Sequence, residues 1–335
     1  IVLTVVVISS VIMIIGVGFR KPLLHLIFGS VEEAVMTNAQ MYFLITALSY
    51  PFIALFQAGA AFYRACGNSK FTMKTALIAN VANIVGNTLF IFVLQMGAAG
   101  AAVSTLISRA LCAFVVFYAL RKPGYAIQLK NYFSIRPDLN LIVKILAIGV
   151  PSGIENGMFQ FGKLAIQSTV SLMGTAAIAA QGMTNIIENL NGIMSIGMGI
   201  GLMTVVGECL GAGEKEEAVY YIKKISIAAE VVLIITCLLM FGLTYPITYF
   251  GGMELESAKL CIFMVTCITI VKPIVWIMAF IPPYGFRAAG DVKFTMTTSM
   301  LCMWLCRVVL AMVLARVFHM GPIAVWIGMF TDWTI

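Results

Sequence analysis

The chain has 335 residues, of which 61% are hydrophobic and only 10% charged, and its formal net charge is +7. Soluble domains are about 45–50% apolar and about 25% charged, so this composition excludes a soluble enzyme, a disordered chain and a coiled coil. The apolar runs are about 20 to 30 residues long, which is the length that a helix needs to cross a bilayer. Strands of a membrane barrel would instead alternate polar and apolar residues over roughly 10 residues. The sequence therefore predicts an all-α polytopic membrane protein.

Ten apolar runs separated by polar breaks predict ten membrane spans. They cover about residues 1–19, 35–62, 71–95, 98–120, 142–172, 175–206, 226–250, 257–284, 292–317 and 321–335. The one long polar connection, 121–141, contains Pro123-Gly124 and Arg136-Pro137, which favour turns and extended chain. We therefore expect an N-terminal bundle in residues 1–120, a linker at 121–141 and a C-terminal bundle in residues 142–335. Because both ends of the chain lie within apolar runs, we interpret it as a fragment.

Basic residues are divided unequally between the loops. One alternate set of loops carries 13 Lys and Arg residues and the opposite set carries 4. Because cytoplasmic loops hold the excess of Lys and Arg, we expect the linker 121–141 to be cytoplasmic. This distribution explains the positive charge without a nucleic-acid partner. We expect a multi-pass protein of a bacterial inner or plasma membrane, acting as a monomer in the lipid bilayer.

The cysteines and histidines predict neither a disulfide framework nor a metal site. The eight cysteines lie almost wholly inside apolar runs, and the two histidines, His25 and His319, are far apart. Such cysteines are typical small apolar packing residues.

The sequence repeats itself at an offset of 223 residues. Residues 64–73 (RACGNSKFTM) and 287–296 (RAAGDVKFTM) are identical at seven of ten positions. The flanks also align, with Tyr50-Pro51 matching Lys272-Pro273. The last four spans therefore repeat the first four, whereas the spans at 142–172 and 175–206 have no earlier counterpart. We expect two six-helix bundles related by a parallel repeat, with the first two helices lacking here. Repeats of this kind are typical of transporters, whose sites lie near the bilayer midplane.

Several motifs resemble those of the multidrug and toxic compound extrusion (MATE) family of efflux antiporters. They are Arg64 to Gly67, Arg287 to Gly290, Gly149 to Gly153, Val206 to Ala212, and Asp332-Trp333. Glu208 stands where the family usually has Gln, and the family's first helix, which often holds a coupling acid, has no counterpart. The resemblance implies a cation-coupled (Na⁺ or H⁺) antiporter that exports amphipathic organic compounds by alternating access. It implies no cofactor besides the coupling ion, and no enzymatic activity.

Charged residues inside the predicted spans are candidate functional groups, because charge in a bilayer is costly. They are Arg109, Glu155, Lys163, Glu188, Glu230, Lys272, Arg307 and Asp332. Their balance of four bases and four acids suggests pairing. The alternative for each is a structural ion pair or a snorkelling side chain.

Two adjacent spans carry polar stripes at helical spacing. The first stripe is Asn156, Gln160, Lys163 and Gln167, with Glu155 at its edge; the second is Gln181, Thr184, Asn185, Glu188 and Asn191. We expect the two stripes to face one another and to line a cavity, with Glu155 or Glu188 as the exchangeable acid. Similar depths make a Lys163–Glu188 ion pair feasible. The alternative is hydrogen bonding between helices.

The remaining spans contain a further polar face and three charged residues that are secondary candidates for lining a cavity. Asn80, Asn83 and Asn87 share one face and line a cavity of the first bundle or bond to a neighbouring helix. Lys272, Arg307 and Asp332 are the secondary cavity candidates. Unpaired bases would repel cations, so a lipid-linked oligosaccharide flippase of the same superfamily is a second hypothesis. A membrane-embedded enzyme is a third, although we find no nucleophile–base set or metal-ligand cluster to support it.

Overall fold

The computed structural model describes residues 2–28, 33–120 and 138–335, and these form helices joined by short turns, with no strand among them. This confirms the all-α prediction. Most of the expected linker, residues 121–137, lies outside the described part of the chain. The chain divides into two compact units, residues 1–145 and 146–335. We call them the N-terminal unit and the C-terminal unit and describe each by itself.

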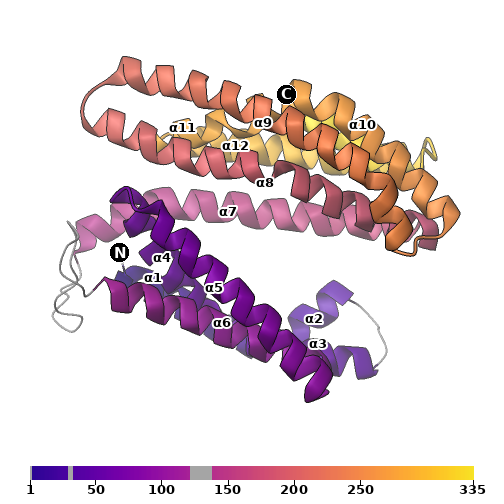
Figure 1. The fold of residues 1–335 in the computed structure, drawn as a ribbon, viewed down its shortest axis with the longest axis horizontal. Helices are drawn as coiled ribbons and strands as arrows, with labels where there is room; N and C mark the ends of the chain where they lie inside the picture. Colours follow the sequence, from indigo (N-terminus) through magenta and orange to yellow (C-terminus); the bar gives the residue numbers. More distant parts are fainter. Residues whose placement is uncertain (1, 29–32, 121–137) are drawn as a thin grey trace. The chain divides into compact units, whose positions relative to one another are not determined.

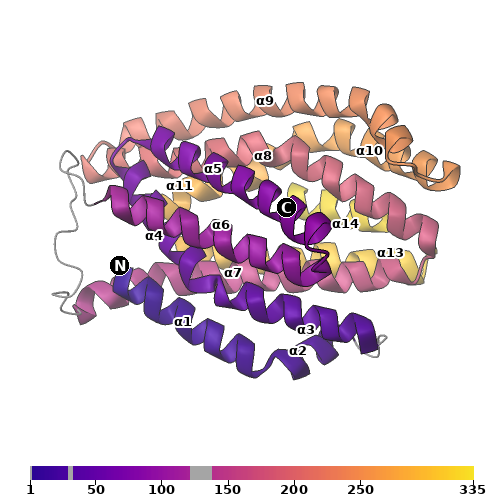
Figure 2. The same ribbon diagram turned by 60° about the horizontal axis from the view of Figure 1, so that its bottom comes forward.

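The N-terminal unit is built around one central helix. Its elements are α1 (Val2–Gly18), α2 (Arg20–Phe28), α3 (Glu33–Leu48), α4 (Tyr50–Ala65), α5 (Ser69–Asn87), the π-helical turn η1 (Thr88–Val93) and α6 (Gly97–Ala119). Helix α6 packs against α3, α4 and α5 (Figures 1 and 2). Tyr63, Val116 and Leu120 form its buried cluster. The small residues of α6, such as Gly100 and Ala102, are buried and let its neighbours approach closely.

The C-terminal unit contains the longest helices. Its elements are α7 (Leu139–Ser171, which begins in the first unit), α8 (Thr175–Gly211), α9 (Lys215–Phe250), α10 (Leu255–Phe280), α11 (Pro282–Ala288), α12 (Val292–Leu301), the π-helical turn η2 (Cys302–Val309), α13 (Leu310–Arg316) and α14 (Ile323–Thr334). Helices α8 and α9 form an antiparallel hairpin, and α10 packs on both (Figure 1). Trp326 of α14 is fully buried within this unit.

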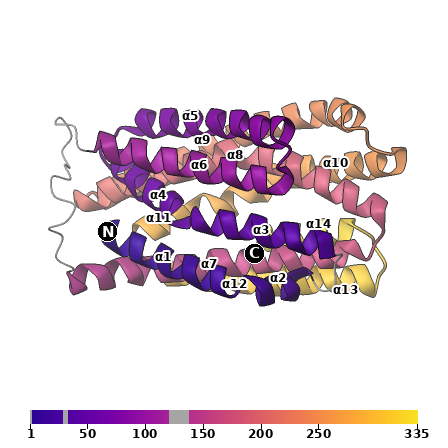
Figure 3. The same ribbon diagram turned by 90° about the horizontal axis from the view of Figure 1, so that it is seen from below.

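Seven helices of the described chain are long and apolar enough to cross a membrane. An eighth span is a bent pair, Val35–Leu48 with Tyr50–Ala65, which meet at 40° (Figure 3). The sequence predicted one span over 35–62, and the bent pair covers it. The bend arises because Pro51, at the start of α4, disfavours a continuous helix. Helix α9 also begins at Lys215 rather than near 226, since the polar residues there extend the helix beyond its apolar run.

The internal repeat is visible in the local backbone of both units. Gly67 and Gly290 have φ of 73° and 89°, a conformation that glycine adopts without strain. The next residues, Asn68 and Asp291, each accept a hydrogen bond from the backbone N–H three residues later, at 3.2 and 3.4 Å. The repeated motif therefore makes the same structure twice, a helix end followed at once by a capped helix start.

Close packing of α14 gives a test of this fold. A Cβ on Gly328 would lie 2.9 Å from the backbone oxygen of Arg307 and 3.2 Å from Cβ of Ala311. Gly328→Ala should lower the free energy of unfolding by about 1–3 kcal/mol, because backbone must move to make room. The measurement is thermal unfolding of the purified protein in detergent.

Gly201→Ala is the matched control, since Gly201 of α8 is exposed with no atom near its Cβ position. Alanine there should leave the melting temperature unchanged or raise it. A Gly328→Ala protein that melts at or above the unsubstituted protein contradicts the described contact between α14 and η2.

Candidate functional site

The C-terminal unit contains a cavity of about 390 Å³ lined by α7, α8, α10, α11, α12, η2 and α14. We call it the C-terminal cavity. Its charged lining residues are Glu155, Arg287 and Asp332; its aromatic ones are Phe159, Phe280, Tyr284, Phe286, Phe294 and Trp333; its hydroxyl-bearing ones are Thr295, Thr298 and Ser299. A mainly apolar wall with a few convergent polar groups is typical of small-molecule sites.

Two largely buried ion pairs involve the charged residues of this cavity. Glu155 Oε1 lies 2.6 Å from Arg287 Nη2, and Asp332 Oδ2 lies 2.6 Å from Arg307 Nη2. Glu155 Oε2 is buried and has no hydrogen-bond partner among the described residues. One carboxylate oxygen is therefore committed to the arginine and the other is left for a proton, an ion or water.

Local sequence places Arg287 at this cavity. Helix α10 ends at Phe280, and Pro282-Pro283 begins α11, where the missing N–H of proline costs no helical hydrogen bond. Arg287 lies in the last turn of α11, 5.6 Å over the ring of Tyr284. Arg287 was not among the predicted site residues. The signal that could have found it is the repeated motif in which it stands.

The polar stripe of α7 does not act as one surface. Asn156 lines the C-terminal cavity, although its amide donates to the backbone oxygen of Ser152 at 2.8 Å. Gln160 and Lys163 are exposed and do not line that cavity, and Lys163 Nζ lies 5.0 Å over the ring of Phe159. The stripe therefore contributes its Glu155–Asn156 end to the cavity.

The polar face of α8 is directed into the C-terminal unit. Gln181 accepts a 2.9 Å hydrogen bond from Trp326 Nε1 of α14 and donates to Asn185. Thr184 donates to Cys261 of α10, and Asn191 donates to Cys237 of α9. These bonds fit the helix–helix alternative for Gln181, Thr184 and Asn191, whereas Asn185 bonds within α8.

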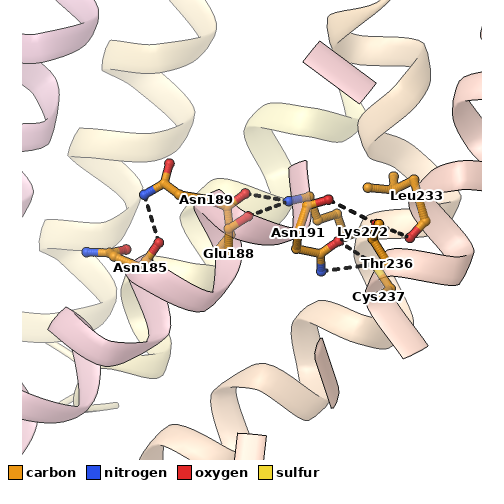
Figure 4. A network of polar contacts seen from close by, with 8 residues as sticks. All are labelled: Asn185, Glu188, Asn189, Asn191, Leu233, Thr236, Cys237 and Lys272. Carbon is orange, nitrogen blue, oxygen red and sulfur yellow. Dashed lines mark hydrogen bonds and ion pairs between the residues drawn. The ribbon is translucent and has the colours of Figure 1, made fainter. Parts of the chain in front are cut away.

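Glu188 forms an ion pair, but not with the predicted partner. Lys272 of α10, whose side chain is 0% exposed, lies with Nζ 2.7 Å from Glu188 Oε1 and 3.1 Å from the Glu188 backbone oxygen (Figure 4). The Lys163–Glu188 pair, which similar depths make feasible, is not formed in the described part of the chain. Depth along the helices allowed it, but the Glu188 face of α8 turns toward α10, whereas the contacts of α7 run to α11 and η2.

Space for the lysine is provided by a glycine. A Cβ on Gly192, one turn after Glu188, would lie 3.2 Å from Lys272 Nζ. On its other side Nζ lies 5.0 Å over the ring of Trp276. The ammonium is thus enclosed by a carboxylate, a carbonyl, an aromatic face and a residue without a side chain.

The N-terminal unit has a second cavity of about 280 Å³ between α4, α5 and α6. We call it the N-terminal cavity. Asn80 and Asn83 line it, as one of the two sequence interpretations expected. Asn83 also donates to Ser108 at 3.3 Å, and Asn87 donates to Asn83 at 3.1 Å. Asn87 therefore supports Asn83 and does not itself line the cavity.

Within the described residues, no group of three His, Cys, Asp or Glu side chains could hold a metal ion.

Two helical units that repeat one structural motif, each with a polar cavity among apolar helices, define the class of membrane transporters. A family model described as MatE matches residues 1–89 and 151–313. The chain belongs to the MatE family, which confirms the resemblance seen in the sequence.

Curated relatives cover nearly the whole chain. The probable multidrug resistance protein NorM of Thermotoga maritima is 24% identical over 318 residues, which are 91% of this chain and 66% of that protein. The probable multidrug resistance protein YoeA of Bacillus subtilis is 25% identical, over 95% of this chain and 69% of that protein. The chain thus spans about two thirds of the length of these relatives. They are transporters and not enzymes.

Solved structures share the fold. An outward-facing multidrug resistance MATE transporter superposes with a TM-score of 0.89 at 18% identity, over 99% of this chain and 74% of the other. An inward-facing one superposes with a TM-score of 0.75 at 19% identity, over 99% and 76%.

The Lys272–Glu188 pair gives a second test. Glu188→Gln should lower the free energy of unfolding by about 3–5 kcal/mol, because it leaves an enclosed ammonium without its counter-charge. Adding Lys272→Met should recover most of the loss, since the double variant removes both charges. Thermal unfolding in detergent measures each step.

Lys163→Met is the control, because that ammonium is exposed and has no recorded ion pair within the described chain. It should change the melting temperature little. If Glu188→Gln is as stable as the control, the pair is not the enclosed contact described here.

Proposed function

We propose that this chain forms most of a cation-coupled antiporter that exports amphipathic organic compounds by alternating access. The observation that carries the proposal is the C-terminal cavity, where Glu155 holds one oxygen on Arg287 and the other without a partner. The names of the curated relatives, which are multidrug resistance proteins, support the substrate class. The existence of inward-facing and outward-facing structures of this fold supports the mode of transport.

Glu155 is the better of the two candidate coupling acids. Its carboxylate lines a cavity, whereas Glu188 is held by a fully enclosed lysine and by α8 itself. A proton or Na⁺ on Glu155 would weaken the contact with Arg287, and so loosen the tie between α7 and the end of α11. Coupling requires that the ion bind one conformation more tightly than the other, and a contact between two helices can differ in this way.

Asp332 is placed as a second acidic group of the same cavity. It contacts Arg307, which is almost fully buried in η2. The two carboxylates come from α7 and α14, so movement of either helix changes the spacing of negative charge in the cavity. We propose that Asn156 and Asp332 complete the polar surface seen by the coupling ion, which is Na⁺ or H⁺.

The remaining assignments belong to the same proposal. The protein lies in a bacterial inner or plasma membrane as a monomer, with the 121–141 linker on the cytoplasmic side. Its partners are lipid and small amphipathic solutes. Two bundles, 1–120 and 142–335, form the moving parts.

Glu155→Gln tests the role of the acid. The substitution keeps the shape of the side chain but removes the exchangeable charge, so export of an ethidium-type dye driven by an imposed Na⁺ or pH gradient should fall at least tenfold. Dye efflux is measured by fluorescence in cells that express the protein. Surface expression is checked in parallel.

Glu208→Gln is the matched control, because Glu208 is an exposed carboxylate on α8, another long helix of the same unit, and lies outside the C-terminal cavity. It should leave export unchanged. Export that persists in Glu155→Gln at the level of this control rejects Glu155 as the coupling acid, and dye export that ignores both gradients rejects the antiporter.

A further inference from the structure

Helix α9 has one exposed face that runs along its whole length. Its buried side chains, such as Leu233 and Met240, pack toward α8 and α10. A set of exposed side chains falls within about 80° of one another at 100° per residue; the set is Tyr220, Lys224, Val231, Ile235, Leu238, Tyr245 and Tyr249. Because α9 is long and apolar enough to cross a membrane, this face lies against lipid.

Tyrosines stand at both ends of this face. Tyr220 is 55% exposed before the apolar run, and Tyr245 is 70% exposed near its other end. The two lie about 37 Å apart along the helix axis. That spacing falls between the thickness of the hydrocarbon, about 30 Å, and that of the whole bilayer, about 40–45 Å. Because tyrosine is enriched at membrane–water interfaces, the spacing places Tyr220 in the headgroup layer.

Two lysines lie one turn from Tyr220, on its hydrocarbon side. Lys223 and Lys224 are exposed, and Lys224 Nζ lies 5.5 Å over the ring of Tyr220. Side chains of a helix lean toward its N-terminus, so both lysines extend back toward the headgroup layer. Snorkelling lysines use their apolar stems in this way and keep the ammonium in a polar layer. Both cations therefore reach the depth of the lipid phosphates.

Within the described chain, neither lysine has an acidic partner. No ion pair of Lys223 or Lys224 is recorded there. The nearest acids along α9 are Glu217 and Glu230, and each is at least about 9 Å away along the axis. Both are beyond ion-pair contact. The compensating charge for these two cations therefore comes from outside the helix.

The opposite end of α9 lacks this charge. Tyr249 and Phe250 are 72% and 86% exposed there, yet the last turn contains no basic residue. The aromatic side chains are thus common to both ends, whereas the lysines occur at one. Lys223 and Lys224 also belong to the loops with the excess of Lys and Arg, and the cytoplasmic leaflet is the one that carries anionic lipid.

We propose that Tyr220, Lys223 and Lys224 form a binding site for the headgroup of an anionic phospholipid, whose acyl chains lie along Ile227 and Val231. Ammonium groups and a tyrosine hydroxyl donate hydrogen bonds to phosphate oxygens, and Ile227 and Val231 are exposed apolar residues of α9 next to the lysines. A choline headgroup would add a cation beside the two lysines, so the site favours an anionic over a zwitterionic lipid. The inference goes beyond the proposed function, since it requires neither a coupling ion nor a solute.

Native mass spectrometry of the purified chain in detergent tests the site. Phosphatidylglycerol and phosphatidylcholine with the same acyl chains are added separately, and the affinity of the first bound lipid is measured. Phosphatidylglycerol should bind at least fivefold more tightly than phosphatidylcholine. The double variant Lys223→Gln, Lys224→Gln should weaken phosphatidylglycerol binding at least fivefold and change phosphatidylcholine binding less than twofold.

The double variant Lys215→Gln, Lys293→Gln is the matched control. It removes the same charge from two exposed positions of the C-terminal unit and should change the affinity for phosphatidylglycerol less than twofold. Thermal unfolding without added lipid should be the same for both double variants, which separates binding from folding. An equal loss of phosphatidylglycerol binding in the control, or equal affinity of the unsubstituted protein for the two lipids, overturns the proposal.

A last arm distinguishes a lipid from a soluble anion. Inorganic phosphate or glycerol 3-phosphate, added in excess, should not displace phosphatidylglycerol, because neither has acyl chains to lie along α9. Displacement by either compound would overturn the assignment to a lipid. No gradient and no transported solute enter these measurements, so their outcome is independent of whether the antiporter proposal holds.

Discussion

Compensation of charge inside apolar helices is the constraint on which this structure depends. An isolated charge among hydrocarbon side chains is costly, and removing one member of a buried pair is more costly than never having the pair. The C-terminal unit meets this constraint with three ion pairs that join α8 to α10, α7 to α11 and η2 to α14. Each pair ties together helices that are distant in sequence, so the charges specify which helices are neighbours.

The two units use one scaffold for different electrostatics. Both repeat the turn at Gly67 and Gly290 and both hold a cavity among matching helices. Among the described residues, the C-terminal cavity pairs each of its acids with an arginine, and one oxygen of Glu155 there has no partner.

Much of the fold was predictable from the sequence because membrane helices are recognisable by the length and apolar composition of their segments. Composition and run length predicted the all-α class, and the identity between residues 64–73 and 287–296 predicted the repeated turn. The bend between α3 and α4 was missed, because the apolar run continues unbroken through Pro51. The early start of α9 was missed because helix formation does not stop at the edge of an apolar run.

The site was less predictable, for a geometric reason. Helical spacing shows which residues share a face, but not the direction in which that face points. The polar residues of α8 share one face, as predicted, but that face points toward α10. Glu188 therefore contacts Lys272 and not Lys163. Arg287 was not predicted as a site residue because it lies at a helix end, outside the polar stripes. Only three-dimensional packing brings it to Glu155. Which candidates bind an ion stays a prediction.

The enclosure of Lys272 has an evolutionary consequence. Its ammonium contacts Glu188 and lies close to the bare backbone of Gly192. A substitution at any one of these three positions alone therefore leaves an unpaired charge or a steric clash. Descendants of this gene should therefore change them jointly, and positions 188, 192 and 272 should covary across lineages as a single inherited unit.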